Sequence, residues 1–483
     1  MDAVRLALIL MTVQRYFSMA VNFTMVAVIS RLLRPEEIGI AVIGSTIAAL
    51  AVSTREFAAM AFLVQKKDLT THDVRAAFSV LTLVTGFVAA GLSISAGWIA
   101  SAYDQPMLVP FLHVVSVALV LELVSAPIVS LLQRNMQFGK VALITTLQVG
   151  SSAGMTVWFA MEGLSSMSYA WGWLVSAAAS GLIALYLWRD YSIYRPVLKG
   201  WREMLTFGGY NGANQFLYRI YESVPYMFLG RIISMDAVGL YNRAMTICQV
   251  PDKVFLSGII AVALPAFSAR AREAGSLKAP YLRGVSYITA VMWPAQVIVA
   301  ILAHPIVLVL LGSQWTGAVP VVQIIALALM FAFSAELNYP VLIAMGAVRT
   351  TFTRALIAWP VSTAALCLGA FFGLKVMALS LFFAVPFQAV VSVYAVRNCI
   401  DLRWLEIFAA VRSSIVVTLF AAAGPLAVVA FAGFRFDLSV PVGLGAGGLA
   451  AIGWLLGLWL TRHPLAHEIA NSVTILRASL ASR

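Results

Sequence analysis

Long apolar runs recur along almost the whole chain, and this feature restricts the possible fold more than any other. Residues 76–100 and 107–132 are two examples. About 20 consecutive apolar residues are needed for an α-helix to cross the hydrocarbon core of a bilayer. Such runs must be helical, because lipid offers no hydrogen-bond partner to the backbone and a helix satisfies its own. The sequence therefore predicts an all-α integral membrane protein.

The apolar runs predict about 14 transmembrane helices. The seventh run contains Arg219, Glu222 and Pro225, and Lys375 stands between the eleventh and twelfth. The predicted spans are 7–32, 38–64, 76–100, 107–133, 141–161, 167–187, 208–233, 238–267, 287–311, 319–345, 355–374, 376–396, 415–432 and 440–460.

The composition agrees with a membrane protein and argues against nucleic acid as a partner. Hydrophobic residues make up 61% of the 483 residues and charged residues only 11%, too few charges to cover a soluble surface of this size. The net charge of +12 arises in short loops between apolar runs, not in a basic domain. Membrane topology explains this charge better than nucleic-acid binding does.

The basic residues are distributed unequally between the two sets of loops. Of the 32 Lys and Arg residues, 22 lie at the termini or in loops after even-numbered spans, and 5 lie near loops after odd-numbered spans. Because cytoplasmic loops are enriched in Lys and Arg, both termini are predicted to be cytoplasmic in a bacterial inner membrane. The connections 188–203 and 268–283 fall on the same side. The loops on the opposite side are too short to form a domain.

An internal repeat relates the two halves of the chain. Residues 30–40 recur as residues 230–240, with an Arg, an acidic residue and a Gly in the same places. Pro110 and Pro320, and likewise Pro127 and Pro340, occupy roughly equivalent positions in the same order. The repeat predicts two six-helix lobes, residues 1–200 and 201–400, followed by two extra helices and a cytoplasmic tail in residues 401–483. Duplicated membrane halves are typical of transporters with a substrate site between the halves.

Charged residues inside the apolar runs are the candidate substrate-binding residues. A charge at the centre of a membrane helix costs about 2.5–3.5 kcal/mol on insertion scales, so these residues need a partner or a cavity. They fall only in the first, second and fourth spans of each half, which predicts that these helices line a shared polar interior. The candidates are Arg15, Arg55, Glu56, Glu122, Arg219, Glu222, Arg243, Asp252, Lys253 and Glu336.

Two interpretations of these charges are open. An anionic head group is one partner, because the planar guanidinium donates two parallel hydrogen bonds to phosphate. Internal salt bridges are the other: Arg219 and Glu222 are i,i+3 neighbours, and Arg55 is placed to pair across helices. Arg243 is expected near an outer helix end, with its head group reaching the interface.

Other chemistry-bearing residues suggest neither an enzyme nor a cofactor site. The three cysteines have no metal-site spacing, and no glycine-rich phosphate loop, catalytic triad or metal cluster is seen. His113 and His304 are interpreted as core histidines, and the other three as solvated loop residues. No cofactor and no metal are therefore expected.

Several segments together resemble the polysaccharide transporter family of the multidrug/oligosaccharidyl-lipid/polysaccharide exporter superfamily. They are RLLRPEEIG at 31–39, LVQKKDLT at 63–70, LLQRNMQF at 131–138, GLYNRA at 239–244, LPAFS at 264–268 and LGSQW at 311–315, followed by Pro320. The resemblance covers roughly residues 7–400. It implies two facing lobes, alternating access, and flipping of undecaprenyl-pyrophosphate-linked oligosaccharides for exopolysaccharide, capsule or lipopolysaccharide. A polysaccharide polymerase and a chain-length regulator are the further partners considered, beside membrane lipids.

Two alternatives to a flippase are kept. A cation-coupled multidrug-type exporter of the same superfamily would favour an acidic, apolar cavity, whereas this chain carries several arginines in its spans. A membrane polymerase or ligase of lipid-linked sugars would need a sizeable outer loop with catalytic residues. The outer loops here are short, so a transporter is favoured over an enzyme.

Overall fold

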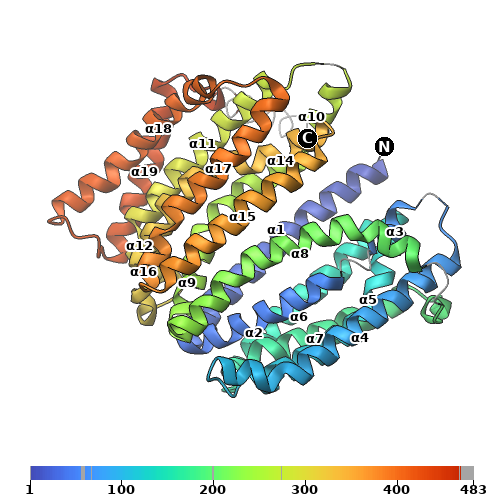
Figure 1. Cartoon of the computed structure of the whole chain (residues 1–483). Coiled ribbons are helices and arrows are strands. Elements are labelled where there is room, and N and C mark those ends of the chain that lie inside the picture. The colour runs from blue at the N-terminus through green and yellow to red at the C-terminus, as the bar shows by residue number, and fades with distance from the viewer. Residues whose placement is uncertain are drawn as a thin grey trace, which may run out of the picture. The chain divides into compact units, whose positions relative to one another are not determined.

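The computed structural model describes residues 2–55, 60–66, 68–197, 201–273, 275–466 and 468, and every regular element among them is a helix (Figure 1). The chain divides into two compact units, Met1–Gly239 and Leu240–Arg483, so that the boundary falls inside helix α9. The predicted all-α class is confirmed. The sequence repeat instead divides the chain at residues 200 and 400, into two lobes and a C-terminal part. That division stays a prediction.

The first unit contains α1 to α8 and the start of α9. These helices are α1 (Asp2–Leu32), α2 (Pro35–Ser53), α3 (Met60–Gln65), α4 (Thr71–Ala102), α5 (Leu108–Arg134), α6 (Phe138–Met161), α7 (Met167–Leu187), α8 (Trp201–Ile232) and α9 (Met235–Cys248). Helix α5 packs against both α4 and α7, while α8 packs against α2 and α4 (Figure 1).

The second unit contains the remaining helices. They are α10 (Ser257–Arg272), α11 (Lys278–Ile301), α12 (Ala303–Leu310), α13 (Val319–Leu329), α14 (Ala335–Ala344), α15 (Val348–Ala370), α16 (Leu374–Leu379), α17 (Leu381–Ile400), α18 (Trp404–Phe431) and α19 (Val440–Leu460). The two extra helices of the sequence analysis, α18 and α19, pack on each other, and α18 packs along α11. They are therefore an integral part of this unit.

Ten helical segments among the described residues are long and apolar enough to cross a membrane. The count of fourteen is not confirmed: the predicted spans 7–32, 141–161, 208–233 and 238–267 are helical but are not among the ten. The predicted spans 355–374 and 376–396 are separate helices, α15 and α17 with the short α16 between them. Gly373, whose φ of 105° suits glycine, lies in the turn before α16.

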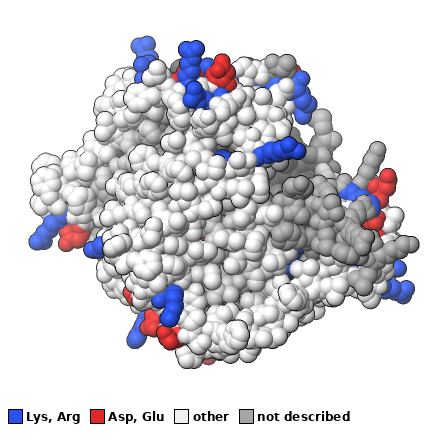
Figure 2. Space-filling view, viewed as in Figure 1, with Lys and Arg blue, Asp and Glu red and all other residues white. Residues whose placement is uncertain are grey.

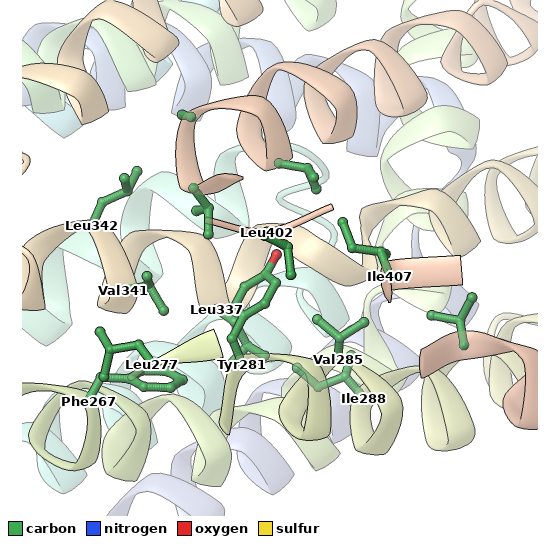
Figure 3. Close-up of a cluster of buried hydrophobic side chains, with 14 of the residues drawn as sticks. Phe267, Leu277, Tyr281, Val285, Ile288, Leu337, Val341, Leu342, Leu402 and Ile407 are labelled. Atoms are coloured by element: carbon green, nitrogen blue, oxygen red, sulfur yellow. The ribbon is translucent and has the colours of Figure 1, made fainter. Parts of the chain in front are cut away.

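Apolar side chains and small residues build the interior of each unit. In the second unit, Tyr281 of α11 lies at the centre of a buried cluster with Leu337, Val341 and Ile407 (Figure 3). Most of the surface visible in Figure 2 carries no charge, and the Lys, Arg, Asp and Glu side chains seen there gather mainly at its margins. A wide uncharged surface is what lipid requires of a membrane protein.

The repeated segments themselves meet at the start of α2 and the start of α9. A Cβ atom added to Gly39 would overlap the carbonyl oxygen of Met235, and one added to Gly239 would overlap the carbonyl oxygen of Pro35. The two contacts are reciprocal, and their residues are related by the same offset of 200 that the sequence repeat shows. Glycine is needed at both places because the two backbones approach too closely for any side chain.

Candidate functional site

The second helix of each half is interrupted, and the interruptions lie at nearly corresponding positions. Helix α2 ends at Ser53 and is followed by a single tight turn, Thr54–Arg55. In the second half, α9 ends at Cys248, and a π-helical turn, Asp252–Leu256, precedes α10. Interrupted helices at matching places in two repeats are the best general indication of a transporter binding site, and π-helical turns are frequent at functional sites.

Three side chains of the first unit, from the turn after α2 and from α5 and α7, form a cluster at the first interruption. Arg55 Nη1 contacts Glu122 Oε2 of α5 at 2.8 Å, and the indole N–H of Trp173 on α7 donates to Glu122 Oε1 at 2.8 Å. Only 11% of the Arg55 side chain and 19% of the Glu122 side chain are exposed. The structure thus brings together two predicted site residues and adds Trp173, which the sequence analysis missed.

A second ion pair lies on α8. Arg219 Nη1 contacts Glu222 Oε2 at 2.8 Å, and the Tyr218 hydroxyl donates to Glu222 Oε1 at 2.7 Å. The side chains of Arg219 and Glu222 are 49% and 40% exposed. The pairing expected from their i,i+3 spacing is confirmed. Because both groups remain accessible, the pair does not exclude contact with a ligand.

The other candidates on described helices differ in exposure. Arg15 lies on α1 with an exposed side chain. Asp252 is half-buried and Lys253 is exposed on the π-helical turn. Glu336 lies in α14, directly after the tight helical turn Met330–Ser334 that interrupts the tenth span, but its side chain is outside the described residues. Glu56 also lies outside them.

Arg243 is not where the sequence analysis expected it. The expectation of an interfacial side chain is wrong, because only 4% of Arg243 is exposed. Its guanidinium lies 5.9 Å from the ring centre of the fully buried Trp315, and its Nη1 donates to Asn242 Oδ1 at 3.3 Å. An aromatic face stabilises a desolvated cation, which allows this arginine to be enclosed within the second unit.

His463 is a second correction. It was expected to be a solvated loop residue, yet it is fully buried just after α19. Its Nδ1 accepts the backbone N–H of Leu465 at 3.2 Å, and its Nε2 lies 3.0 Å from Ser286 Oγ. The bond to Nδ1 requires the neutral ring, with the proton on Nε2. Burial lowers the pKa of His463, in agreement with this state.

These arrangements suit reversible anion binding. A guanidinium held by a carboxylate keeps donors that a phosphate can engage in the bidentate manner. Burial of the Arg55–Glu122 pair lowers the local dielectric constant and strengthens such contacts. No group of three His, Cys, Asp or Glu side chains that could hold a metal ion occurs in the described part of the chain.

Comparison with known proteins identifies a family. The model of the polysaccharide biosynthesis protein family matches residues 28–320, more than half of the chain. The chain is 23% identical to the lipopolysaccharide biosynthesis protein WzxC of Escherichia coli (strain K12) over 302 residues, which are 62% of this chain and 61% of WzxC. It is 25% identical to the succinoglycan biosynthesis transport protein ExoT of Rhizobium meliloti (strain 1021) over 363 residues, 74% of this chain and 72% of ExoT. The match thus spans about three fifths of the length of WzxC.

Solved structures show the same fold. The lipid II flippase MurJ in an inward closed conformation has a TM-score of 0.74 at 12% identity, over 94% of this chain and 99% of that chain. An inward-facing multidrug resistance MATE family transporter of the MOP superfamily has a TM-score of 0.57 at 13% identity, over 84% of this chain and 98% of that chain. Identities this low show the fold alone. The family match and these likenesses together establish that the chain belongs to the polysaccharide biosynthesis protein family and has the membrane-transporter fold of MurJ and MATE proteins.

Proposed function

We propose that this protein flips lipid-linked oligosaccharides across a bacterial inner membrane by alternating access, with both termini in the cytoplasm. The observation that carries the proposal is the Arg55–Glu122–Trp173 cluster, which places a buried guanidinium at an interrupted membrane helix. The names of WzxC and ExoT, which concern lipopolysaccharide biosynthesis and succinoglycan transport, support a polysaccharide precursor as the cargo.

The substrate in this proposal is an undecaprenyl-pyrophosphate-linked repeat unit. Its pyrophosphate cannot cross hydrocarbon unshielded, because an uncompensated charge in an apolar medium is very costly. Arginine side chains offset the lost hydration with charge-assisted hydrogen bonds. Arg15 of α1, Arg55 of the turn after α2, and Arg219 of α8, all in the first unit, are the proposed phosphate-binding residues. A polymerase and a chain-length regulator are proposed to receive the product.

Deletion of the gene tests whether the protein acts at the flipping step. A deletion strain should accumulate complete lipid-linked repeat units and export no polymer, because flipping follows assembly of the unit and precedes polymerisation. Mass spectrometry of lipid extracts checks this outcome. Incomplete units in these extracts would place the protein at an earlier step and contradict the proposal.

Arginine variants test the mechanism in the same strain. Arg15→Ala, Arg55→Ala and Arg219→Ala should each reduce export at least about tenfold at normal membrane abundance, and Arg→Lys should recover only part because the ammonium lacks the bidentate fork. Arg349→Ala, at an exposed arginine near the start of α15, is the matched control. Normal export from all three site variants would refute a cationic phosphate site.

A multidrug-type exporter is the second candidate function, favoured by the likeness to MATE transporters. It predicts that expression in a drug-sensitive strain raises resistance to cationic dyes, and that this resistance collapses when the ion gradient is removed. The flippase proposal predicts no change in dye resistance and full restoration of polymer in the deletion strain. The two measurements on one plasmid distinguish the candidates.

A further inference from the structure

A long apolar groove lies within the first unit, between α2, α4 and α8. Its volume is about 650 Å³. One face of α4 lines most of its length, and Phe216 of α8 contributes from the side. The lining residues are Ile47, Leu50, Ala51 and Thr54 of α2 and its following turn, Leu83, Val84, Phe87, Val88, Gly91, Leu92, Ser95 and Ile99 of α4, and Phe216.

The lining is suited to a hydrocarbon chain. Its two polar side chains are already satisfied: Ser95 Oγ donates to the carbonyl of Gly91 at 2.7 Å, and Thr54 Oγ1 donates to that of Ala51 at 2.7 Å. Leu83 and Phe87 expose 61% and 83% of their surface. A Cβ added to Gly91 would meet nothing within 4 Å, so the wall is open at that point.

The groove is long enough for an extended chain. Leu83 and Ile99 lie 16 positions apart on α4, which corresponds to about 24 Å at the helical rise of about 1.5 Å per residue. This is most of the roughly 30 Å of a bilayer core. A linear chain lying along α4 would therefore follow the membrane normal for most of the membrane thickness.

No charged residue lines the groove, but two arginines stand close in the chain to residues that line it. Thr54, which lines the groove, is followed directly by Arg55, whose guanidinium is held by Glu122. Phe216, which also lines it, is three residues before Arg219 and therefore on the same face of α8. Residues 54–70, which include the short α3, lead from the end of α2 to the start of α4, so Thr54 lies toward the Leu83 end of the groove. Arginines next to an apolar groove match an anionic head group attached to a hydrocarbon chain.

We propose that this groove, called the α4 groove, holds the polyisoprenoid chain of a substrate whose diphosphate contacts Arg55 and Arg219. This inference rests on the proposed flippase function and deepens it, by assigning the lipid part of the substrate to a site built from α2, α4 and α8. The chain keeps its contact with apolar side chains while the head group is transferred, so its hydrocarbon is never exposed to water.

Three glycines of α4 provide matched variants. Gly91 lines the groove, whereas Gly86 and Gly97 lie on other faces of the same helix, and a Cβ at any of the three meets nothing within 4 Å. Gly91→Phe fills the groove and should lower polymer export at least about tenfold. Gly86→Phe and Gly97→Phe add the same ring on faces away from the groove and should leave export within about twofold of the wild type, at equal membrane abundance.

Photolabelling tests the site without any variant. Purified protein in vesicles is exposed to a short polyprenyl diphosphate that carries a diazirine on its chain, and labelled peptides are mapped. Labelling within residues 83–99, displaced by unlabelled polyprenyl diphosphate and not by phosphatidylglycerol, is the expected result. Labelling instead in a second apolar groove of about 400 Å³, which Leu302, Val309 and Leu444 line, would overturn the proposal.

Three further outcomes distinguish a failure of the groove proposal from a failure of the flippase function. Equal labelling of residues 83–99 by a diazirine phospholipid would show that ordinary membrane lipid fills the groove, and the proposal would fail. Normal export from Gly91→Phe together with lost export from Arg55→Ala would refute the groove and leave the flippase function standing. Complete export from the deletion strain would instead refute the function.

Discussion

The environment of each arginine in the predicted spans depends on the side chains that it contacts more than on its position along the span. In the sequence, Arg55, Arg219 and Arg243 are all candidate substrate-binding residues within apolar runs. In the structure Arg55 is held by a carboxylate that Trp173 also contacts, Arg219 is paired on its own helix, and Arg243 is enclosed beside an aromatic ring. Each environment predicts a different result of mutation.

Removal of Glu122 alone should lower membrane abundance more than removal of both members of the Arg55–Glu122 pair, because a lone carboxyl can be neutralised by a proton but a lone guanidinium stays charged. Glu122→Leu leaves a buried guanidinium without its counter-charge, at a cost of about 3–5 kcal/mol. We expect low membrane abundance for Glu122→Leu and recovered abundance, without recovered export, for Arg55→Leu/Glu122→Leu. Immunoblots of membranes and polymer assays on the same cultures measure both. Equal loss in the single and double variants would contradict a direct pairing.

Arg243→Ala should now destabilise the second unit, contrary to the tolerance expected of an interfacial residue. A desolvated cation over an aromatic face contributes about 2 kcal/mol or more. The measurement is the thermal unfolding of the purified protein, with the exposed Arg349→Ala as the control. Trp315→Leu should lower the unfolding temperature in the same way, and additivity of the two substitutions would argue against the contact.

The burial of His463 predicts sensitivity to acid. Its pKa is lowered in the folded state, so the unfolded state binds more protons wherever the two states differ. The neutral His463 ring therefore makes its full contribution to stability above the ordinary histidine pKa of about 6.5. This contribution falls as the pH drops below that value. We expect the unfolding temperature to fall between pH 7.5 and about pH 5.5, and to fall less in His463→Gln. His72→Gln, at an exposed site, should behave as the wild type.

At the scale of elements, the two repeats are joined through their most similar segments. Gly39 and Gly239 begin equivalent helices, and each leaves room for the backbone of the other segment. Neither the charges nor the apolar runs of these helices require that contact. It depends on the absence of a side chain at two positions 200 residues apart.

Gly39→Ala and Gly239→Ala should each separate the starts of α2 and α9, because the new Cβ overlaps a carbonyl oxygen that belongs to rigid backbone. We expect each substitution to lower the unfolding temperature and export. Gly86→Ala, which meets nothing within 4 Å, is the matched control and should be neutral or slightly stabilising. Wild-type behaviour of both repeat variants would contradict the close backbone approach.

At the scale of the whole molecule, the distribution of basic residues defines a proposed orientation. The connections 188–203 and 268–283 each carry four basic residues, and the first of them is anchored to its own unit. Arg75 Nε donates to the carbonyl of Ser192 at 2.8 Å, and the Tyr194 hydroxyl donates to that of Val124 at 2.5 Å. This connection therefore packs against the start of α4 and the side of α5.

Both connections are expected to face the cytoplasm. A cysteine introduced at Gly275 should react with a membrane-impermeant maleimide only after the cells are opened. Cysteines at Gln105 and Gly317, in the short loops of the opposite side, should react in intact cells. Labelling of position 275 in intact cells would contradict the orientation and the alternation of spans from which it was inferred.

The sequence alone determined the class of this protein, because transfer of apolar side chains into lipid is a local property that can be summed along a run. The same local reasoning found the sequence repeat and the charged residues within the spans. It gave a salt bridge between Arg219 and Glu222 as one of two interpretations, because one helical turn separates them, and the structure contains this salt bridge. Family motifs, read in order, indicated the transporter fold. Local hydrophobicity did not determine the number of spans, because span 208–233 carries charges and span 238–267 is interrupted.

Only the tertiary structure decided which distant groups meet. Trp173 reaches Glu122 because α5 and α7 pack side by side, and Arg243 is buried because Trp315 lies over it. His463 is enclosed because α11 supplies Ser286, and Gly39 is essential because the backbone near Met235 crosses it. In each case the deciding partner comes from another helix or turn, and helix packing, unlike hydrophobic partition, cannot be read from one segment at a time.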